Sequence, residues 1–149
     1  MFFYCIRLLR EDNKMQIYKN ILVTVDGSSA DKRILEHVAL LAQQNKANVT
    51  ILHVVHSHTI DQERALHEKA TAMLDSYAEQ MKQHNINVKK LIRSGEPEKE
   101  ILKEIEENEY DLVAMGTHGH KLLGDILYGS VSDTLKHAIR LPLLLIKAE

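Results

Sequence analysis

The sequence is poor in cysteine and lacks any hydrophobic run long enough to cross a membrane. Its one cysteine, Cys5, excludes an internal disulfide framework and is typical of proteins from a reducing compartment. No apolar stretch approaches the ~20 residues that a bilayer-spanning helix needs. The first residues do not form a signal peptide, because Arg7 interrupts their apolar run and no small-residue cleavage site follows. We therefore expect a cytoplasmic protein without a membrane partner.

A strong excess of charge is absent as well. The 19 lysines and arginines nearly balance the 21 aspartates and glutamates, which gives a net charge of -2 and a pI near 6.5. Such a chain has no cationic field to attract a phosphate backbone, so no nucleic-acid partner is expected. With 44% hydrophobic and 27% charged residues, its 149 residues are typical of one globular domain.

The N-terminal segment differs from the rest of the chain. Residues 1–16 precede the first convincing strand, and a second methionine, Met15, lies close to their end. We expect this segment to be a flexible extension, and we expect residues 17–149 to form a single domain.

Apolar, β-branched runs alternate with stretches of helical spacing in residues 17–149. The runs predict strands at 19–26, 48–55, 87–93, 111–115 and 143–147. The first helix is predicted after Ser28 or Ser29, whose hydroxyl can cap it. Further helices are predicted over 61–84, from Pro97, and from Val131 to a point before Pro142.

The alternation of strands and helices predicts the fold class. Continuously apolar strands are typical of a parallel sheet that is covered on both faces and joined by right-handed crossovers. We predict an α/β fold, with a single doubly wound, Rossmann-like domain, five parallel strands in the order 3-2-1-4-5 and helices on both faces. Ligands of such folds bind beyond the carboxyl ends of the strands, where the strand order reverses. The first and fourth strands would meet there and bring Asp26 close to Gly116.

A glycine-bearing pattern follows the fourth predicted strand. Gly116 and Gly119 are followed, after nine residues, by Gly129 and Ser130. A glycine directly after a strand lets backbone N–H groups approach an anion with no Cβ in the way. Ser130 and Ser132 would place hydroxyls at the start of the last helix, where free N–H groups and the helix dipole favour phosphate. The predicted loop from Gly116 to Gly129 is therefore a candidate phosphate site.

Two common phosphate-binding motifs are excluded, whereas a structural interpretation stays open. The pattern has no Gly-Lys-Ser/Thr of a P-loop, and it is not the dinucleotide fingerprint, which needs three close glycines after the first strand. A glycine turn and a helix cap alone would also account for Gly116 and Gly129. Likewise, the sequence that begins at Asp26 is a good turn and capping sequence as well as a candidate site.

These motifs together resemble the universal stress protein family over residues 17–148. The spacing of the glycines and the serine matches the nucleotide-binding signature of family members that bind ATP. The resemblance extends to KNILVTVDGS at the first strand, ILHVV at the second, Gly95 and Pro97 after the third, and DLVAMGTHG at the fourth. One departure is Thr24, where some ATP-binding relatives have proline.

The resemblance implies an adenine-nucleotide site at the carboxyl ends of the strands. Asp26 would lie beside the ribose or a metal ion held by the phosphates, and Val54 would contact the adenine through its backbone. Met115 and Gly116 would flank the base and ribose. The residues implied to hold the phosphates are Gly119, Gly129, Ser130, Val131 and Ser132. The implied ligand is ATP, or else ADP or AMP, with Mg²⁺. The implied partner is a second copy of the chain, joined through the apolar C-terminal strand, which would otherwise be an open sheet edge.

Two further groups of residues are assigned no site. His53, His56 and His58 lie close together, but no cysteine or carboxylate is near enough in sequence to complete a tetrahedral metal site. Solvated loop histidines are the preferred interpretation. The acidic run 104–109 is interpreted as the solvated end of the third helix.

Three functional hypotheses follow. The first is a nucleotide-dependent regulatory or signalling protein, whose partners read the state that the nucleotide stabilises. The second is an ATP hydrolase or another ATP-consuming enzyme. Fast phosphoryl transfer needs a cationic clamp and a positioned nucleophile, and only Lys121 and Asp26 are candidates, so at most slow hydrolysis is expected. The third is an interaction module whose glycine loop holds no ligand.

Overall fold

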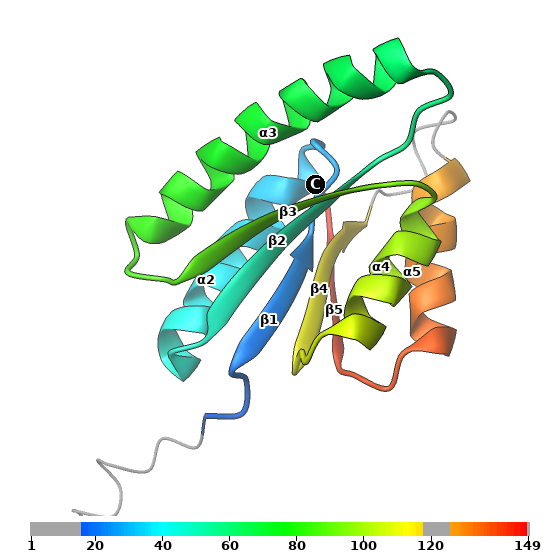
Figure 1. The fold of residues 1–149 in the computed structure, drawn as a ribbon. Coiled ribbons are helices and arrows are strands. Elements are labelled where there is room, and N and C mark those ends of the chain that lie inside the picture. Colours follow the sequence, from blue (N-terminus) through cyan, green and yellow to red (C-terminus); the bar gives the residue numbers. More distant parts are fainter. Residues whose placement is uncertain (1–15, 118–125, 149) are drawn as a thin grey trace, which may run out of the picture.

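Strands and helices alternate along the described part of the chain (Figure 1). The computed structural model describes residues 16–117 and 126–148. The strands are β1 (Asn20–Thr24), β2 (Asn48–Val55), β3 (Val88–Ser94), β4 (Leu112–Thr117) and β5 (Leu143–Lys147). The helices are α2 (Ala30–Asn45), α3 (Ile60–Lys82), α4 (Pro97–Glu107) and α5 (Ile126–Ala138). Among these described helices, none has the length and apolarity that crossing a membrane requires.

The strands form one parallel sheet in the order β3-β2-β1-β4-β5, as predicted from the sequence. The order reverses between β1 and β4, whose pairing runs from Ile21 opposite Leu112 to Thr24 opposite Met115. The carboxyl ends of β1 and β4 therefore lie side by side, where a doubly wound fold binds its ligands.

Helices cover both faces of the sheet (Figure 1). Helices α2 and α3 pack on one face, and α4 and α5 pack on the other. Successive side chains of β1 point to opposite faces, so Ile21 and Val23 enter the core under α2 and α3, while Leu22 enters the core under α4 and α5. All three side chains are fully buried. This double burial explains why β1 is apolar at consecutive positions.

Polar side chains fix the register at the amino ends of the strands. Asn48 donates from Nδ2 to Oδ1 of Asn20 at 3.1 Å, and Asn87 donates to Oδ1 of Asn48 at 2.9 Å. The Asp111 carboxylate accepts the backbone N–H groups of Lys19 and Asn20 at 2.7 and 2.9 Å. These bonds connect the starts of four neighbouring strands.

The two edges of the sheet carry different side chains. Strand β3 exposes Lys89 and Lys90, and Lys90 pairs with Asp75 of α3. Strand β5 is the apolar sequence LLLIK, and Leu145 on it is 37% exposed.

One predicted boundary is wrong. Helix α5 begins at Ile126, so Gly129 and Ser130 lie within the helix and do not end the preceding loop. Ser130 and Ser132 are the fifth and seventh residues of the helix, beyond its first turn. A glycine in a helix costs only about 1 kcal/mol relative to alanine, and burial of Val131 and Leu135 on the same helix offsets this cost. The glycine was therefore a poor marker of the boundary.

Candidate functional site

The loop between β1 and α2 contributes residues to the candidate site, which lies at the carboxyl ends of the strands. The N–H of Val25 still donates to the Leu52 carbonyl at 2.9 Å, and beyond it the chain leaves the sheet. Gly27 has φ +83°, a conformation that favours glycine. The Asp26 carboxylate accepts the backbone N–H of Ser28 at 2.9 Å, which closes a tight turn.

Asp31, in the first turn of α2, holds this loop. Its side chain is buried, at 2% exposure, and it accepts the N–H of Asp26 at 3.2 Å and the N–H of Gly27 at 2.7 Å. The Tyr77 hydroxyl of α3 donates to the same carboxylate at 3.0 Å. Burial, followed by the nearby charge of Asp26, raises the pKa of Asp31 to about 6. The Ser29 side chain makes no capping bond, so the prediction of a serine cap is wrong.

Asp31 was not predicted from the sequence as a site residue, because the two preceding serines are stronger helix-capping candidates. A signal was nevertheless present. An acidic residue in the first turn of a helix that directly follows a buried strand lies close to the free N–H groups of the connecting loop.

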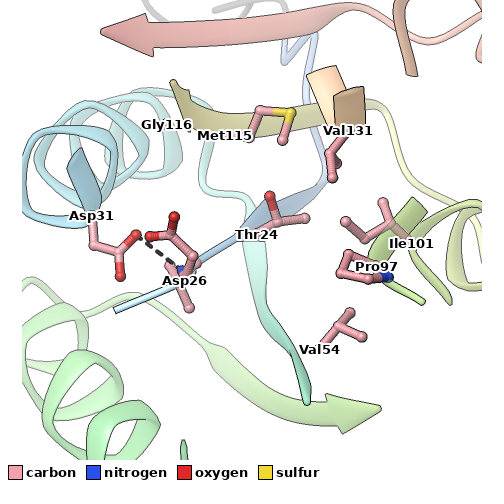
Figure 2. Close-up of a pocket in the computed structure, with 10 residues that line it drawn as sticks. Thr24, Asp26, Asp31, Val54, Pro97, Ile101, Met115, Gly116 and Val131 are labelled. Carbon is pink, nitrogen blue, oxygen red and sulfur yellow. Dashed lines mark hydrogen bonds between the residues drawn. The ribbon is translucent and has the colours of Figure 1, made fainter. Parts of the chain in front are cut away.

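A small cavity of about 20 Å³ lies at the carboxyl ends of β1, β2 and β4 (Figure 2). Its lining residues come from these strand ends, the β1–α2 segment, α4 and α5, and they are Thr24, Val25, Asp26, Asp31, Val54, Pro97, Ile101, Met115, Gly116 and Val131. Five of the nine predicted site residues are among them: Asp26, Val54, Met115, Gly116 and Val131. The structure therefore brings together the predicted base- and ribose-binding residues.

The four other predicted site residues are placed differently. Gly119 lies outside the described residues. Gly129 and Ser130 lie in α5, and Ser132 is half-buried on the same helix without lining the cavity. The phosphate-binding part of the prediction stays a prediction.

Gly116 has a packing role. A Cβ at this position would lie 2.6 Å from the Cβ of Ala30, which is closer than side chains approach each other. The glycine therefore lets β4 pack against the start of α2. Its φ is not in the left-handed region, so conformational freedom is not the reason for it.

A larger cavity of about 490 Å³ lies on the α3 side of the β1–α2 loop. Its wall combines residues of α3, the end of β2 and the loop, namely Asp26, Gly27, His53, Val54, Val55, His56, Leu66, Lys69, Ala70, Met73 and Tyr77. Asp26 and Val54 line both cavities. The two cavities therefore adjoin at Asp26 of the loop and Val54 of β2.

The histidines are not all solvated loop residues. His53 belongs to β2, is partly buried, and its Nδ1 lies 2.8 Å from the Val25 carbonyl. His56 follows the strand, and its Nδ1 lies 3.1 Å from the Gly95 carbonyl. Within residues 16–117 and 126–148, no three histidine, cysteine or acidic side chains are grouped so that they could hold a metal ion.

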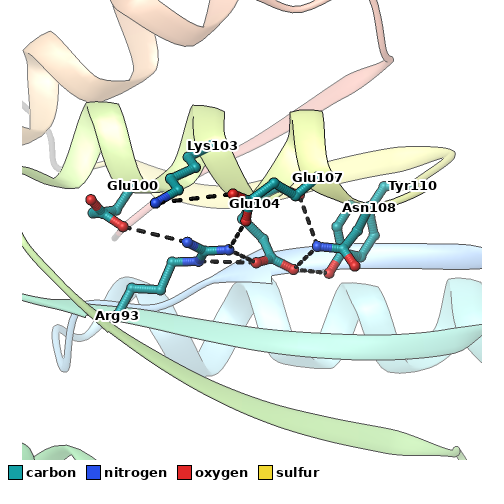
Figure 3. A network of polar contacts seen from close by, with 7 residues as sticks. All are labelled: Arg93, Glu100, Lys103, Glu104, Glu107, Asn108 and Tyr110. Atoms are coloured by element: carbon teal, nitrogen blue, oxygen red, sulfur yellow. Dashed lines mark hydrogen bonds and ion pairs between the residues drawn. The ribbon is translucent and has the colours of Figure 1, made fainter.

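The acidic run on α4 is only partly solvated, which corrects the sequence interpretation (Figure 3). Glu104 is 1% exposed and accepts hydrogen bonds from Arg93 Nε at 3.0 Å, the Tyr110 hydroxyl at 2.7 Å and Asn108 Nδ2 at 2.9 Å. Arg93 reaches from β3 and also pairs with the half-exposed Glu107. Hydrogen bonds to Glu107 and Glu104 raise the pKa of Arg93 above its already high ordinary value. This network joins β3 to α4 and has no residue in either cavity.

Comparison with known proteins agrees with this architecture. The model of the universal stress protein family matches residues 17–147. Universal stress protein YxiE of Bacillus subtilis is 25% identical, over 88% of this chain and 100% of its own. Universal stress protein MJ0577 of Methanocaldococcus jannaschii is 26% identical over 88% of this chain and 96% of its own. The solved structure of MJ0577 superposes with a TM-score of 0.78 at 28% identity, and the match covers 89% of this chain and 98% of that one.

Solved universal stress proteins with bound nucleotides share the fold. They are complexes with cAMP (TM-score 0.71, 18% identity), with AMP in a protein of Arabidopsis thaliana (0.68, 20%) and with dAMP in a protein of Archaeoglobus fulgidus (0.69, 21%). These matches cover 88–89% of this chain and 92–99% of the others. The order of the strands, the residues gathered at the reversal point and the family match over residues 17–147 lead to one conclusion: the chain belongs to the universal stress protein family.

Proposed function

We propose that the protein binds an adenine nucleotide at the carboxyl ends of β1, β2 and β4. The observation that carries this proposal is the convergence of Asp26, Val54, Met115 and Gly116 on one cavity at the point where the strand order reverses. These residues are far apart in sequence and come from three neighbouring strands. The fold therefore gathers them at the position where doubly wound proteins bind nucleotides.

The chemistry of these residues fits a nucleoside. Val54, Ile101 and Met115 offer apolar surface for a purine base. The Asp26 carboxylate is an acceptor for a hydroxyl group of the ribose. The hydroxyl of Ser28, next to Asp26, is buried and has no hydrogen-bond partner within the described residues. Such a group is costly unless water or another polar partner satisfies it.

The cavity must widen to accept a base. Its volume of about 20 Å³ is close to the space that one water molecule occupies. A nucleotide would therefore separate side chains of the β1–α2 loop from those of β2 and β4 when it binds.

ATP is the proposed ligand, with Mg²⁺ accompanying its phosphates. Adenine is common to the nucleotides bound by the relatives solved with cAMP, AMP and dAMP, whereas the phosphate groups differ. The spacing of Gly116, Gly119, Gly129 and Ser130 supports a triphosphate ligand. Phosphates would lie towards the start of α5, since free N–H groups of a helix start attract anions.

Isothermal titration calorimetry with ATP, ADP, AMP and GTP tests the proposal. We expect the adenine nucleotides to bind and GTP to bind at least about tenfold more weakly, because base recognition by shaped pockets typically contributes 1.4 kcal/mol or more. Val54→Trp would fill the cavity and abolish binding. Leu40→Trp, at an exposed position of α2, is the matched control and should bind as the parent does. Equal affinity of both variants for ATP would contradict the proposed site.

The proposed role is regulatory. We infer a cytoplasmic stress-response module whose nucleotide-bound state is read by a downstream protein, and we expect at most slow ATP hydrolysis. The residues around the cavity supply acceptors and apolar surface, which suit binding of the ground state but do not stabilise the transition state of phosphoryl transfer. Single-turnover incubation with ATP and Mg²⁺ should give a rate well below about 1 per second. A faster rate would favour the alternative, an ATP-consuming enzyme.

A further inference from the structure

We propose that Asp31 is a positioning residue of the nucleotide site, which sets the place of Asp26 by holding the backbone of the β1–α2 loop. The inference rests on the proposed function. It adds a residue that lines the cavity but is not among the predicted nucleotide contacts, and it connects the site to α3 through Tyr77.

The hydrogen bonds show how the loop is held. The two carboxylate oxygens of Asp31 accept three donors, which are the N–H groups of Asp26 and Gly27 and the Tyr77 hydroxyl. In Figure 2 the Asp31 side chain points at the backbone of Asp26. The carboxylate of Asp26 accepts the N–H of Ser28 in the turn and lies near the Asp31 carboxylate, and Asp26 lines the cavity. One buried side chain thus determines the direction of the residue expected to contact the ribose.

The position of this loop divides the space between two cavities. Asp26 borders both the 20 Å³ cavity and the 490 Å³ cavity on the α3 side. Gly27 is backed by α3, because a Cβ there would lie 3.3 Å from Sδ of Met73. Movement of the loop towards α3 would enlarge the smaller cavity at the expense of the larger one. Because Asp31 and Tyr77 hold the loop through their hydrogen bonds, they would limit how far the smaller cavity can widen for a base.

The charge of Asp31 matters for the bonds that it makes. Two ionisable groups lie next to Asp31: Asp26 of the β1–α2 loop and Tyr77 of α3. Both also line the larger cavity, together with His53 and Lys69. Burial and the charge of Asp26 raise the pKa of Asp31 to about 6. Above that pH the carboxylate accepts all three donors. Below it the protonated oxygen becomes a donor itself and loses at least one of them.

Asp31→Asn tests this role. The amide is isosteric with the carboxylate, but its NH₂ group would face one of the three donors, so the loop is no longer held. We expect ATP affinity at pH 7.5 to fall about tenfold, which corresponds to the loss of one charge-assisted hydrogen bond. We also expect the parent protein to bind ATP more weakly at pH 5 than at pH 7.5. Titration of the nucleotide itself is common to both proteins, so the difference between their pH profiles belongs to Asp31.

Two further variants complete the experiment. Tyr77→Phe removes only the hydroxyl donor, so the ATP affinity of this variant should fall less than that of Asp31→Asn. The midpoint of its pH profile should move to higher pH, because the Asp31 carboxylate has lost a hydrogen-bond donor. Asp75→Asn, at an exposed site of α3, is the control and should match the parent protein.

The outcomes separate the two proposals. If the parent protein binds no adenine nucleotide, the proposed function fails. If the parent protein binds ATP, but Asp31→Asn and Tyr77→Phe keep its affinity and its pH profile, the positioning role of Asp31 is overturned and the proposed function stands.

Discussion

Gly116 lines the cavity of the proposed nucleotide site and is also required by packing. Its position would place a Cβ 2.6 Å from the Cβ of Ala30, across the contact between β4 and α2. We predict that Gly116→Ala lowers the free energy of unfolding by about 1–3 kcal/mol, the usual cost of overpacking a core. Urea denaturation measures this loss.

The double variant Gly116→Ala with Ala30→Gly supplies the control. It removes the colliding methyl group, so it should be more stable than the single Gly116→Ala variant, although glycine in the first turn of α2 has a cost of its own. Equal stability of Gly116→Ala and the parent protein would show that the contact relaxes freely.

Glu104 carries the second prediction for a single residue. Its carboxylate is buried and bonded to Arg93, Asn108 and Tyr110. Glu104→Ala leaves a mostly buried guanidinium without its main partner, so we predict a loss of about 3–5 kcal/mol in the free energy of unfolding. Glu107→Ala removes a more exposed partner of the same arginine and should cost clearly less than Glu104→Ala. Denaturant titrations that show similar losses for the two variants would disprove this difference.

Glu104 and Asp31 also mark what the sequence could not predict at this scale. Both are carboxylates on the first or last turns of helices, where solvated acidic residues are common. Only the tertiary structure supplies their partners, because Arg93 and Tyr77 come from other elements. Asp26 was predictable, since it follows the end of a buried strand and the fold class determines where such ends meet, whereas Val54 and Met115 were implied by the family resemblance.

The starts of two helices give a prediction for elements. Thr59 caps α3, as its Oγ1 accepts the N–H of Gln62 at 3.2 Å, whereas Ser29 occupies the corresponding position of α2 without a side-chain bond. We predict that Thr59→Ala costs about 1 kcal/mol of unfolding free energy. Ser29→Ala should cost less than half of that. Thermal unfolding of both variants measures the difference, and a larger loss for Ser29→Ala would contradict it.

The predictability of elements followed the strength of their hydrophobic pattern. Strands β2 and β5 were placed with their observed bounds, and Pro97 begins α4 as expected. Buried strands and right-handed crossovers predicted the parallel sheet, and the observed order of the strands is the doubly wound order expected for it. The start of α5 was placed five residues late, because glycine and serine are signals for a loop and also tolerable residues in a helix.

The whole molecule is expected to form a two-fold dimer through β5. This strand is an apolar sheet edge with Leu145 37% exposed, and such an edge invites pairing with another chain. We predict that sedimentation velocity shows a dimer at micromolar concentration. Leu145→Lys should shift it to a monomer, while Leu40→Lys, at an exposed position of α2, should not. A monomeric parent protein, with or without ATP, would contradict the dimer.

The unlike edges of the sheet have a consequence for assembly size. At the β3 edge, exposed Lys89 opposes the approach of a second such edge, since like charges would meet, whereas Lys90 is paired with Asp75 of α3. Of the two sheet edges in the described part of the chain, we therefore expect only the β5 edge to pair with another chain. In the predicted dimer a two-fold axis would pair that edge with itself, so no edge would remain for a third chain and growth would stop at two chains. With two adhesive edges, the same sheet could extend without limit into a fibre.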